Sequence, residues 1–261
     1  MPNSEPRTTL LTHIFNEEYL LPFWLQHHKN LFDDLIVVDY NSTDSSIDIC
    51  KRLWPGCTIR QSRNEFFGAD EVDQEIMDIE NDLSGVKMVL NTTEFLFCQK
   101  PIKQIFTNTP IPIIYSVQAY EPYSKEEYNP ETLETLIGTV LQDNFTFHKD
   151  RGCRIIHNYK NGAYVVGRHG TKNKCVFHLP ELSILWFGFY PMNEKVLKRK
   201  LQIGSRIPQK DKERGFGTQH YLYNVSKLMD INQNKAENGK KLEDLNPSLY
   251  SFLSKQYSLK Q

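Results

Sequence analysis

Polar residues with the chemistry to bind a ligand follow short apolar runs at four places in the first hundred positions. These places are residues 16–18, 39–44, 62–64 and 91–94. They carry carboxylates, amides, hydroxyls and one guanidinium, which bind hydroxyl groups and phosphates. If each apolar run is a strand of one parallel sheet, these residues meet at its carboxyl edge, where such sheets bind ligands. The spacing therefore predicts a shared binding site.

Asp39 ends one of these apolar runs and precedes a turn rich in hydroxyls and amides. In a nucleotide-binding sheet, an acidic group at this point accepts hydrogen bonds from a base or a ribose. The alternative is that Asp39 and Asp44 only cap the next helix. We favour ligand contact for Asp39 and leave both interpretations open for Asp44.

Glu94 is the carboxylate of the turn at residues 91–94. A divalent cation that bridges a diphosphate to a carboxylate neutralises the charge of the diphosphate. His169 is a second candidate ligand, because a neutral imidazole binds Mn2+, and the adjacent Arg168 suits phosphate. The alternatives are a solvated turn glutamate and a structural histidine.

Asp70 and Asp73 are three positions apart at the start of a predicted helix, so they share a face, and Arg63 lies shortly before them. A functional interpretation places Arg63 near phosphate and one of the two aspartates near a ribose or sugar. The alternative is that acidic residues in a first turn favour the helix dipole. The basic residues between 195 and 200 either close over a diphosphate or form a solvated helix face.

Apolar periodicity predicts an α/β fold with a mostly parallel central sheet flanked by helices. Helices are expected around residues 20–28, 47–53, 72–79 and 192–203. Strands are expected at residues 10–15, 35–38, 58–61, 86–90, 113–117, 154–157, 164–166 and 175–177. From about residue 231 the chain is polar and lysine-rich, which indicates a loosely attached helix or tail.

The composition narrows the class of protein. The chain has 261 residues and a formal net charge of -1, so it has no general positive field for nucleic acid. No apolar run approaches the roughly 20 residues that span a bilayer, and residues 1–9 do not form a secretory signal. The cysteines are five in number and scattered, which favours reduced thiols in a cytoplasmic protein. They are Cys50, Cys57, Cys98, Cys153 and Cys175.

Several of these segments together resemble the GT-A-fold glycosyltransferases of the family-2 type. Residues 12–18 (THIFNEE) are similar to the opening strand and Asn-Glu turn of that family, and residues 39–44 (DYNSTD) to its Asp-x-x-Ser-x-Asp turn. Residues 62–64 follow in the expected order, and residues 90–95 (LNTTEF) stand in place of the Asp-x-Asp-Glu-Phe metal motif. Residues 167–169 and 186–202 are also similar to the small transferase domains of large algal (chlorella) viruses, which include a rhamnosyltransferase domain. The resemblance is good over about residues 9–100 and fair over 150–222.

The resemblance implies inverting transfer of a sugar, such as L-rhamnose or glucose, from a UDP-sugar to a glycan hydroxyl with the help of Mn2+ or Mg2+. Residues 1–110 would form the nucleotide-sugar-binding half, residues 111–230 the smaller, mixed acceptor-binding half, and residues 231–261 the tail. A viral member of this group would act in the host cytoplasm.

The resemblance also assigns individual residues. The uridine would lie against His13, Glu17 and Asp39. Asn91 and Thr93 stand where the family has aspartates, which leaves Glu94 as the metal contact and gives Asn91 a role with a metal-bound water or a ribose hydroxyl.

An inverting transfer also needs a general base. The candidates are carboxylates of the acceptor half, with Asp211, Glu194 and Glu181 first, or a member of the Asp70 and Asp73 pair, of which we favour Asp73.

Two other functions remain open from the sequence. A sugar nucleotidyltransferase would use a similar sheet, but it normally has a glycine-rich phosphate loop where this chain has residues 16–18 (NEE). A non-catalytic carbohydrate- or nucleotide-binding protein derived from a transferase would explain the loss of aspartate at Asn91 and Thr93.

Overall fold

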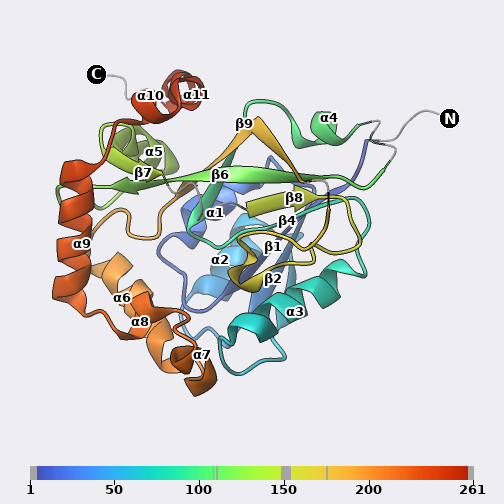
Figure 1. Cartoon of the computed structure of the whole chain (residues 1–261), viewed down its shortest axis with the longest axis horizontal. Helices are drawn as coiled ribbons and strands as arrows, with labels where there is room; N and C mark the ends of the chain where they lie inside the picture. Colours follow the sequence, from blue (N-terminus) through green and yellow to red (C-terminus); the bar gives the residue numbers. More distant parts are fainter. Residues whose placement is uncertain (1–4, 108, 110, 148–153, 175, 258–261) are drawn as a thin grey trace.

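The computed structural model describes residues 5–107, 109, 111–147, 154–174 and 176–257. Within these residues a nine-stranded sheet runs in the order β3-β2-β1-β4-β8-β6-β9-β5, with β7 paired to β6 (Figure 1). The pairings give one common direction to β1, β2, β3, β4, β6 and β9. The predicted α/β class, a mostly parallel central sheet with flanking helices, is confirmed.

The first half alternates strands and helices as the periodicity predicts. Its elements are β1 (Thr8–Ile14), α1 (Leu21–His28), β2 (Asp34–Asp39), α2 (Ser46–Leu53), β3 (Thr58–Gln61), α3 (Ala69–Glu80) and β4 (Val86–Val89). Pro22 lies in the first turn of α1, where its missing N–H costs no hydrogen bond. Strands β3, β2, β1 and β4 are all parallel, so the four polar turns follow their carboxyl ends.

The second half extends this sheet with strands of both directions. Its strands are β5 (Glu94–Cys98), β6 (Ile114–Tyr123), β7 (Asn144–Phe147), β8 (Arg154–His157) and β9 (Val176–Trp186). Its helices are α4 (Ile102–Phe106), α5 (Leu133–Val140), α6 (Glu194–Gln202), α7 (Gln209–Glu213), α8 (Thr218–Tyr221), α9 (Val225–Asn238), α10 (Leu242–Leu245) and α11 (Pro247–Tyr257). Strand β8 inserts antiparallel between β4 and β6 and so joins the two halves into one sheet.

The strand predicted at residues 164–166 is wrong. Tyr164 forms a single bridge to Thr171, and Val166–Arg168 is a 3-10 turn. Gly167 and Arg168 both have positive φ, 79° and 60°, so the chain turns directly after this segment instead of continuing as a strand. Strand β9 is longer than the run predicted around residue 176, and Cys175 lies outside the described residues.

Apolar side chains of alternating strand positions pack against helices on both faces of the sheet, as the period of two requires. Leu10, Leu35 and Val37 face a core that contains Trp24 of α1. Leu11, Ile36 and Val38 face the opposite way, onto Val72, Ile76 and Ile79 of α3. The strand tips are thus held between two packed layers.

The C-terminal helices are more closely packed than the polar sequence indicates. Leu249 and Leu253 of α11 have no exposed surface and belong to the main core beside α5. Helix α9 contacts β6 and β7 (Figure 1). Among the described lysines after residue 231, Lys240, Lys241 and Lys255 are exposed, whereas the half-buried Lys235 donates to Tyr123 Oη at 2.5 Å.

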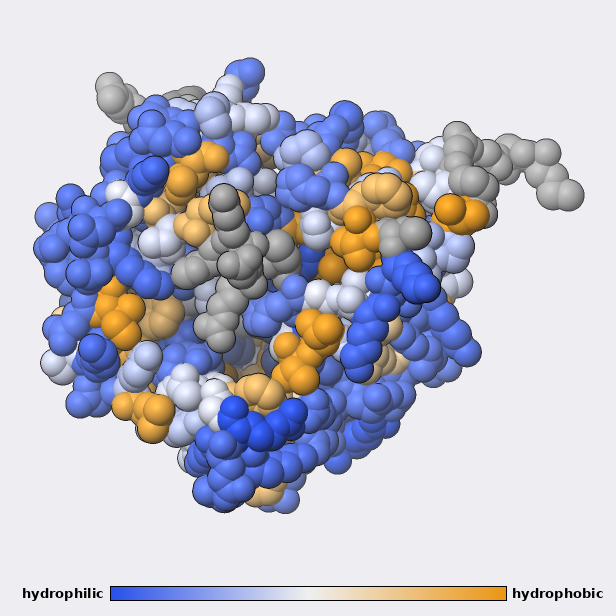
Figure 2. Space-filling model, in the orientation of Figure 1, coloured by the Kyte–Doolittle hydropathy of each residue, from blue (hydrophilic) through white to orange (hydrophobic). Residues whose placement is uncertain are grey.

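The outer surface is mostly hydrophilic on the face in Figure 2, where hydrophobic residues form separate groups. Among the described residues, no helix has both the length and the apolar character needed to span a membrane. Cys50, Cys57 and Cys98 are free thiols, and Cys153 lies outside the described part of the chain.

Candidate active site at the carboxyl edge of the sheet

The turns after β1 and β2 are joined by hydrogen bonds. Asn16 has a left-handed φ of 53°, and its Oδ1 accepts from the Thr43 backbone N–H at 2.8 Å. The Asn16 N–H donates to Ser42 Oγ at 3.1 Å, and the Glu17 N–H donates to Ser46 Oγ at 2.8 Å. Short polar side chains suit these turns because they accept hydrogen bonds from backbone N–H groups that are not paired within a helix or strand.

Asp39 is buried at the end of β2, and its Oδ1 accepts from the Ser42 N–H at 3.0 Å. Asp44 accepts from the N–H groups of Ser46 and Glu18, at 2.9 and 3.1 Å. Both aspartates therefore support the turns. Ligand contact by Asp39 stays a prediction.

Arg168 connects three other predicted site residues, Asp73, Asn91 and His13. Its Nη1 donates to Asp73 Oδ1 at 2.5 Å, and the Gly167 N–H donates to Asp73 Oδ2 at 2.7 Å. Its Nη2 donates to Asn91 Oδ1 at 3.1 Å and to His13 Nδ1 at 3.3 Å. The positive φ of Gly167 and Arg168 turns the chain so that this guanidinium is buried.

Glu94 pairs with Arg154, a residue at the start of β8 that the sequence did not single out. Arg154 Nε lies 3.0 Å from both carboxylate oxygens of Glu94, and Arg154 Nη2 donates to Oε1 at 2.7 Å. The Asn91 N–H donates to Glu94 Oε2 at 2.8 Å. Arg154 Nη1 also donates to the Gly167 carbonyl at 2.7 Å and contacts His169 Nδ1 at 3.2 Å. The turn at residues 91–94, the start of β8 and the turn at residues 167–169 are thus joined in a single polar network.

His13 is neutral in this network. Burial lowers its pKa well below the usual value, and the cations Arg168 and Arg154 lower it further. A neutral imidazole can accept the hydrogen bond from Arg168 at Nδ1, whereas an imidazolium cannot. His13 therefore acts here as an acceptor.

A resident divalent cation does not fit this arrangement. Glu94 is engaged by Arg154 through both oxygens, and the Nδ1 atom of His169 faces the same guanidinium. Among the residues that the structure describes, no three His, Cys, Asp or Glu side chains are grouped to hold a metal ion. The two predicted metal ligands do lie in one network, but their shared partner is an arginine.

Glu17 links this network to helix α6. Its carboxylate is buried 3.4 Å from Arg199 Nη1 and accepts a hydrogen bond from Thr92. Burial raises the pKa of Glu17, and Arg199 opposes that shift. Arg199 thus completes a group of three arginines around the turn at residues 91–94, together with Arg154 and Arg168.

The remaining predicted residues lie outside this network. The exposed Arg63 pairs with Asp78 at 2.6 Å, and the exposed Asp70 pairs with Arg214 at 2.5 Å. Asp211 is buried and accepts from the Ala69 N–H at 2.7 Å, at the start of α3. Glu194 is exposed in the first turn of α6. Their roles in binding and catalysis stay predictions.

An aromatic group lies beside the tips of β1 and β2. Phe67 stacks on Tyr40 with ring centroids 4.4 Å apart, and His13 lies 6.0 Å from both rings. Arg206 covers Phe15 at 4.2 Å and donates to the Tyr40 carbonyl at 2.8 Å. Aromatic faces of this kind can stack on a nucleobase. The sequence did not identify Phe67 or Arg206.

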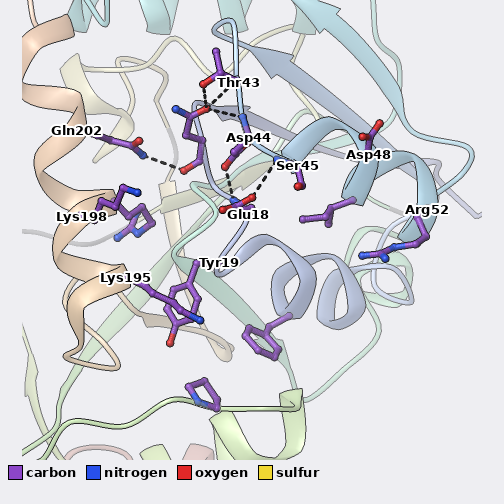
Figure 3. A pocket seen from close by; sticks show the side chains of 15 residues that line it. Glu18, Tyr19, Thr43, Asp44, Ser45, Asp48, Arg52, Lys195, Lys198 and Gln202 are labelled. Carbon is purple, nitrogen blue, oxygen red and sulfur yellow. Dashed lines mark hydrogen bonds between the residues drawn. The ribbon is translucent and has the colours of Figure 1, made fainter.

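A pocket of about 1010 Å³ opens between α6 and the turns after β1 and β2. Figure 3 shows Lys195, Lys198 and Gln202 of α6 opposite Glu18 and Asp44 of the turns. Its wall shares Asn16 and Arg199 with the contacts described above. These are its lining residues: Asn16, Glu18, Tyr19, Phe23, Thr43, Asp44, Ser45, Asp48, Ile49, Arg52, Pro130, Lys195, Lys198, Arg199 and Gln202.

Comparison with known proteins finds weak structural likeness. No family model matches the chain, and no curated protein matches it. TarS 1–349 of S. aureus is 13% identical over 50% of this chain and 44% of that chain, with a TM-score of 0.34. The glucosyl-3-phosphoglycerate synthase of Mycobacterium tuberculosis, in complex with Mn2+, UDP and glucosyl-3-phosphoglycerate, is 16% identical over 44% of each chain, with a TM-score of 0.32. HddC of Yersinia pseudotuberculosis is 8% identical over 67% of this chain and 89% of that chain, with a TM-score of 0.37.

This chain thus spans less than half the length of TarS 1–349 and of the synthase. Likeness at these TM-scores establishes neither a shared fold nor a shared function.

Proposed function

We propose that this protein is a glycosyltransferase that moves a sugar from a UDP-sugar to a hydroxyl of a glycan. One observation carries the proposal: polar side chains from the tips of parallel strands β1 and β4 meet Arg168 and Asp73 in one buried network. Parallel sheets bind nucleotides at this edge. The motif resemblance at residues 12–18 and 39–44 supports the same class of donor.

In this proposal the donor lies across the strand tips. The base stacks near Phe67 and His13, and Asp39 accepts from the ribose. The diphosphate lies against the turn at residues 91–94, where Arg168 stabilises its charge as the bond to the sugar breaks.

The acceptor glycan occupies the pocket beside α6 in this proposal. Tyr19 provides an aromatic face, and the polar residues around it provide hydrogen-bond partners for hydroxyls. Among the candidate bases, Asp73 and Asp211 are buried and hydrogen-bonded, whereas Glu194 is exposed in the first turn of α6. In this proposal Glu194, which directly precedes the pocket residue Lys195, takes the proton of the acceptor hydroxyl, whose oxygen bonds to the anomeric carbon as UDP leaves.

A ligand screen tests the proposal. UDP-glucose and UDP-L-rhamnose should raise the unfolding temperature more than GDP- or dTDP-sugars do, because a ligand that binds the folded state stabilises it. Release of UDP from the stabilising donor should then accompany transfer. If no UDP-sugar stabilises the protein and no UDP is released, the proposal is wrong.

A non-catalytic nucleotide- or carbohydrate-binding protein is the second candidate. The closed ion pairs of Glu94 and Asp73 favour it, because both carboxylates already have partners. Stabilisation by UDP without any release of UDP from UDP-sugars, with a panel of glycan acceptors present, would support this candidate.

A further inference from the structure

We propose that Arg154 takes the place of the divalent cation, so that this site binds the diphosphate of its donor without a metal. The inference rests on the proposed function, since it concerns the same nucleotide site. It reverses the expectation of Mn2+ or Mg2+ that the motif resemblance implies.

Glu94 already has a buried partner in Arg154. Its side chain is only 6% exposed, as is that of Arg154, and the guanidinium engages both carboxylate oxygens. Such a paired, planar contact is the strongest form of this interaction. A cation would have to displace a buried arginine, and the freed charge of that arginine would then repel the cation.

The two arginines of the network balance the charges of its two paired carboxylates. Glu94 and Asp73 contribute two negative charges, and Arg154 and Arg168 contribute two positive charges, so the four side chains are neutral together. Without Arg154 the network would be negative and would repel a phosphate unless a cation were added. Arg154 therefore neutralises carboxylate charge in this network, as a metal ion does at an acidic site.

Two arginines near the turn at residues 91–94 each have a buried N–H with no partner among the described residues. Arg168 is 4% exposed, and its Nε–H has no hydrogen-bond partner among the described residues. The same is true, within the described part of the chain, of the Nε–H of Arg199, which is 8% exposed. A buried donor without a hydrogen bond raises the free energy of the folded protein, so an acceptor supplied by a ligand would stabilise each of these N–H groups. Phosphate oxygens are acceptors that suit arginine.

The test is calorimetric titration with UDP in the presence of EDTA and in the presence of Mn2+. For the wild-type protein we expect the two dissociation constants to agree within about threefold. A tenfold difference would correspond to roughly 1.4 kcal/mol of binding free energy. Binding by the wild-type protein that disappears in EDTA would overturn the inference and leave the proposed function intact. Absence of UDP binding in both conditions would overturn the proposed function, and the inference with it.

The variant Arg154→Met makes the test sharper. It leaves Glu94 charged and unpaired, so UDP should bind at least about tenfold more weakly in EDTA, and Mn2+ should restore much of the loss. The double variant Arg154→Met/Glu94→Gln removes both charges and should bind UDP without a response to Mn2+. This double variant also covers the case in which the single variant fails to fold.

Arg7→Met is the matched control, because Arg7 pairs with Asp34 in an exposed contact away from the network. It should behave as the wild type in both conditions. If Arg154→Met folds and binds UDP as the wild type does, or if the double variant gains a response to Mn2+, Arg154 does not have the role we assign to it.

Discussion

At the scale of single residues, Asp39 supports its turn and has a proposed role with the ribose, and one substitution can separate the two. Asp39→Asn keeps an oxygen to accept from the Ser42 N–H, but it removes the charge that would bind a ribose. We expect UDP to bind about tenfold more weakly, with a small change in the free energy of unfolding, because hydrogen bonds to charged groups are the stronger ones. Calorimetry with UDP and urea unfolding measure the two effects.

Asp82→Asn, at an exposed position, is the control for this substitution and should change neither quantity. An unaltered dissociation constant for Asp39→Asn would limit Asp39 to its role in the turn.

The sequence predicts the residues of the network better than their partners. Glu94, Arg168 and His169 follow from their types and positions, and His13 and Asn91 follow from the motif resemblance. The structure brings all five together. Arg154 was missed because it lies 60 positions from Glu94, at the start of a strand. The two residues come into contact only in the folded sheet, where β8 pairs with β4.

At the scale of elements, the loop that carries Arg168 is held to the end of α3 by a buried carboxylate. Tyr164 Oη donates to Glu80 Oε1 at 2.6 Å, and the Gly162 N–H donates to Glu80 Oε2 at 2.8 Å. Tyr164→Phe removes one of these donors and leaves a buried acceptor less satisfied. We expect a loss of about 1–3 kcal/mol in the free energy of unfolding, measured in urea.

Tyr159→Phe is the matched control, since the Tyr159 hydroxyl makes only a long, exposed contact of 3.5 Å. It should cost less than about 0.5 kcal/mol, as surface substitutions usually do. Equal losses for the two variants would mean that Glu80 does not anchor the loop.

Elements of the first half could be predicted because each strand and helix there follows from a local apolar pattern. The second half depends on long-range pairing. Residues 164–166 have the composition of a strand, but the positive φ of Gly167 and Arg168 and the contact with Asp73 produce a turn instead. Local composition does not reveal long-range contacts that replace an expected strand with a turn.

At the scale of the whole molecule, burial of Lys200 couples stability to pH. Its ammonium lies 4.2 Å from the Phe189 ring centroid, and burial, with the neighbouring Arg199, lowers its pKa to about 7. Between that value and the ordinary lysine pKa, the unfolded chain binds a proton that the folded chain has lost. The contribution of Lys200 to stability therefore rises with pH above 7, by up to about 1.4 kcal/mol per pH unit.

Lys200→Met should remove this dependence. From pH 7 to 8.5, the free energy of unfolding of the wild type should rise relative to that of the variant. Lys210→Met, at an exposed ion pair with Glu71, should follow the wild type. Parallel profiles for wild type and Lys200→Met would contradict the pKa shift of the buried amine.

The central claim is that the carboxyl edge of the sheet binds the diphosphate of a nucleotide-sugar. A crystal structure of the complex with UDP, grown in EDTA, tests it most directly. We predict phosphate oxygens in contact with Arg168 and the turn at residues 91–94, with the base near Phe67. Nucleotide bound elsewhere, for example between Lys195 and Asp48 in the pocket beside α6, would contradict the account.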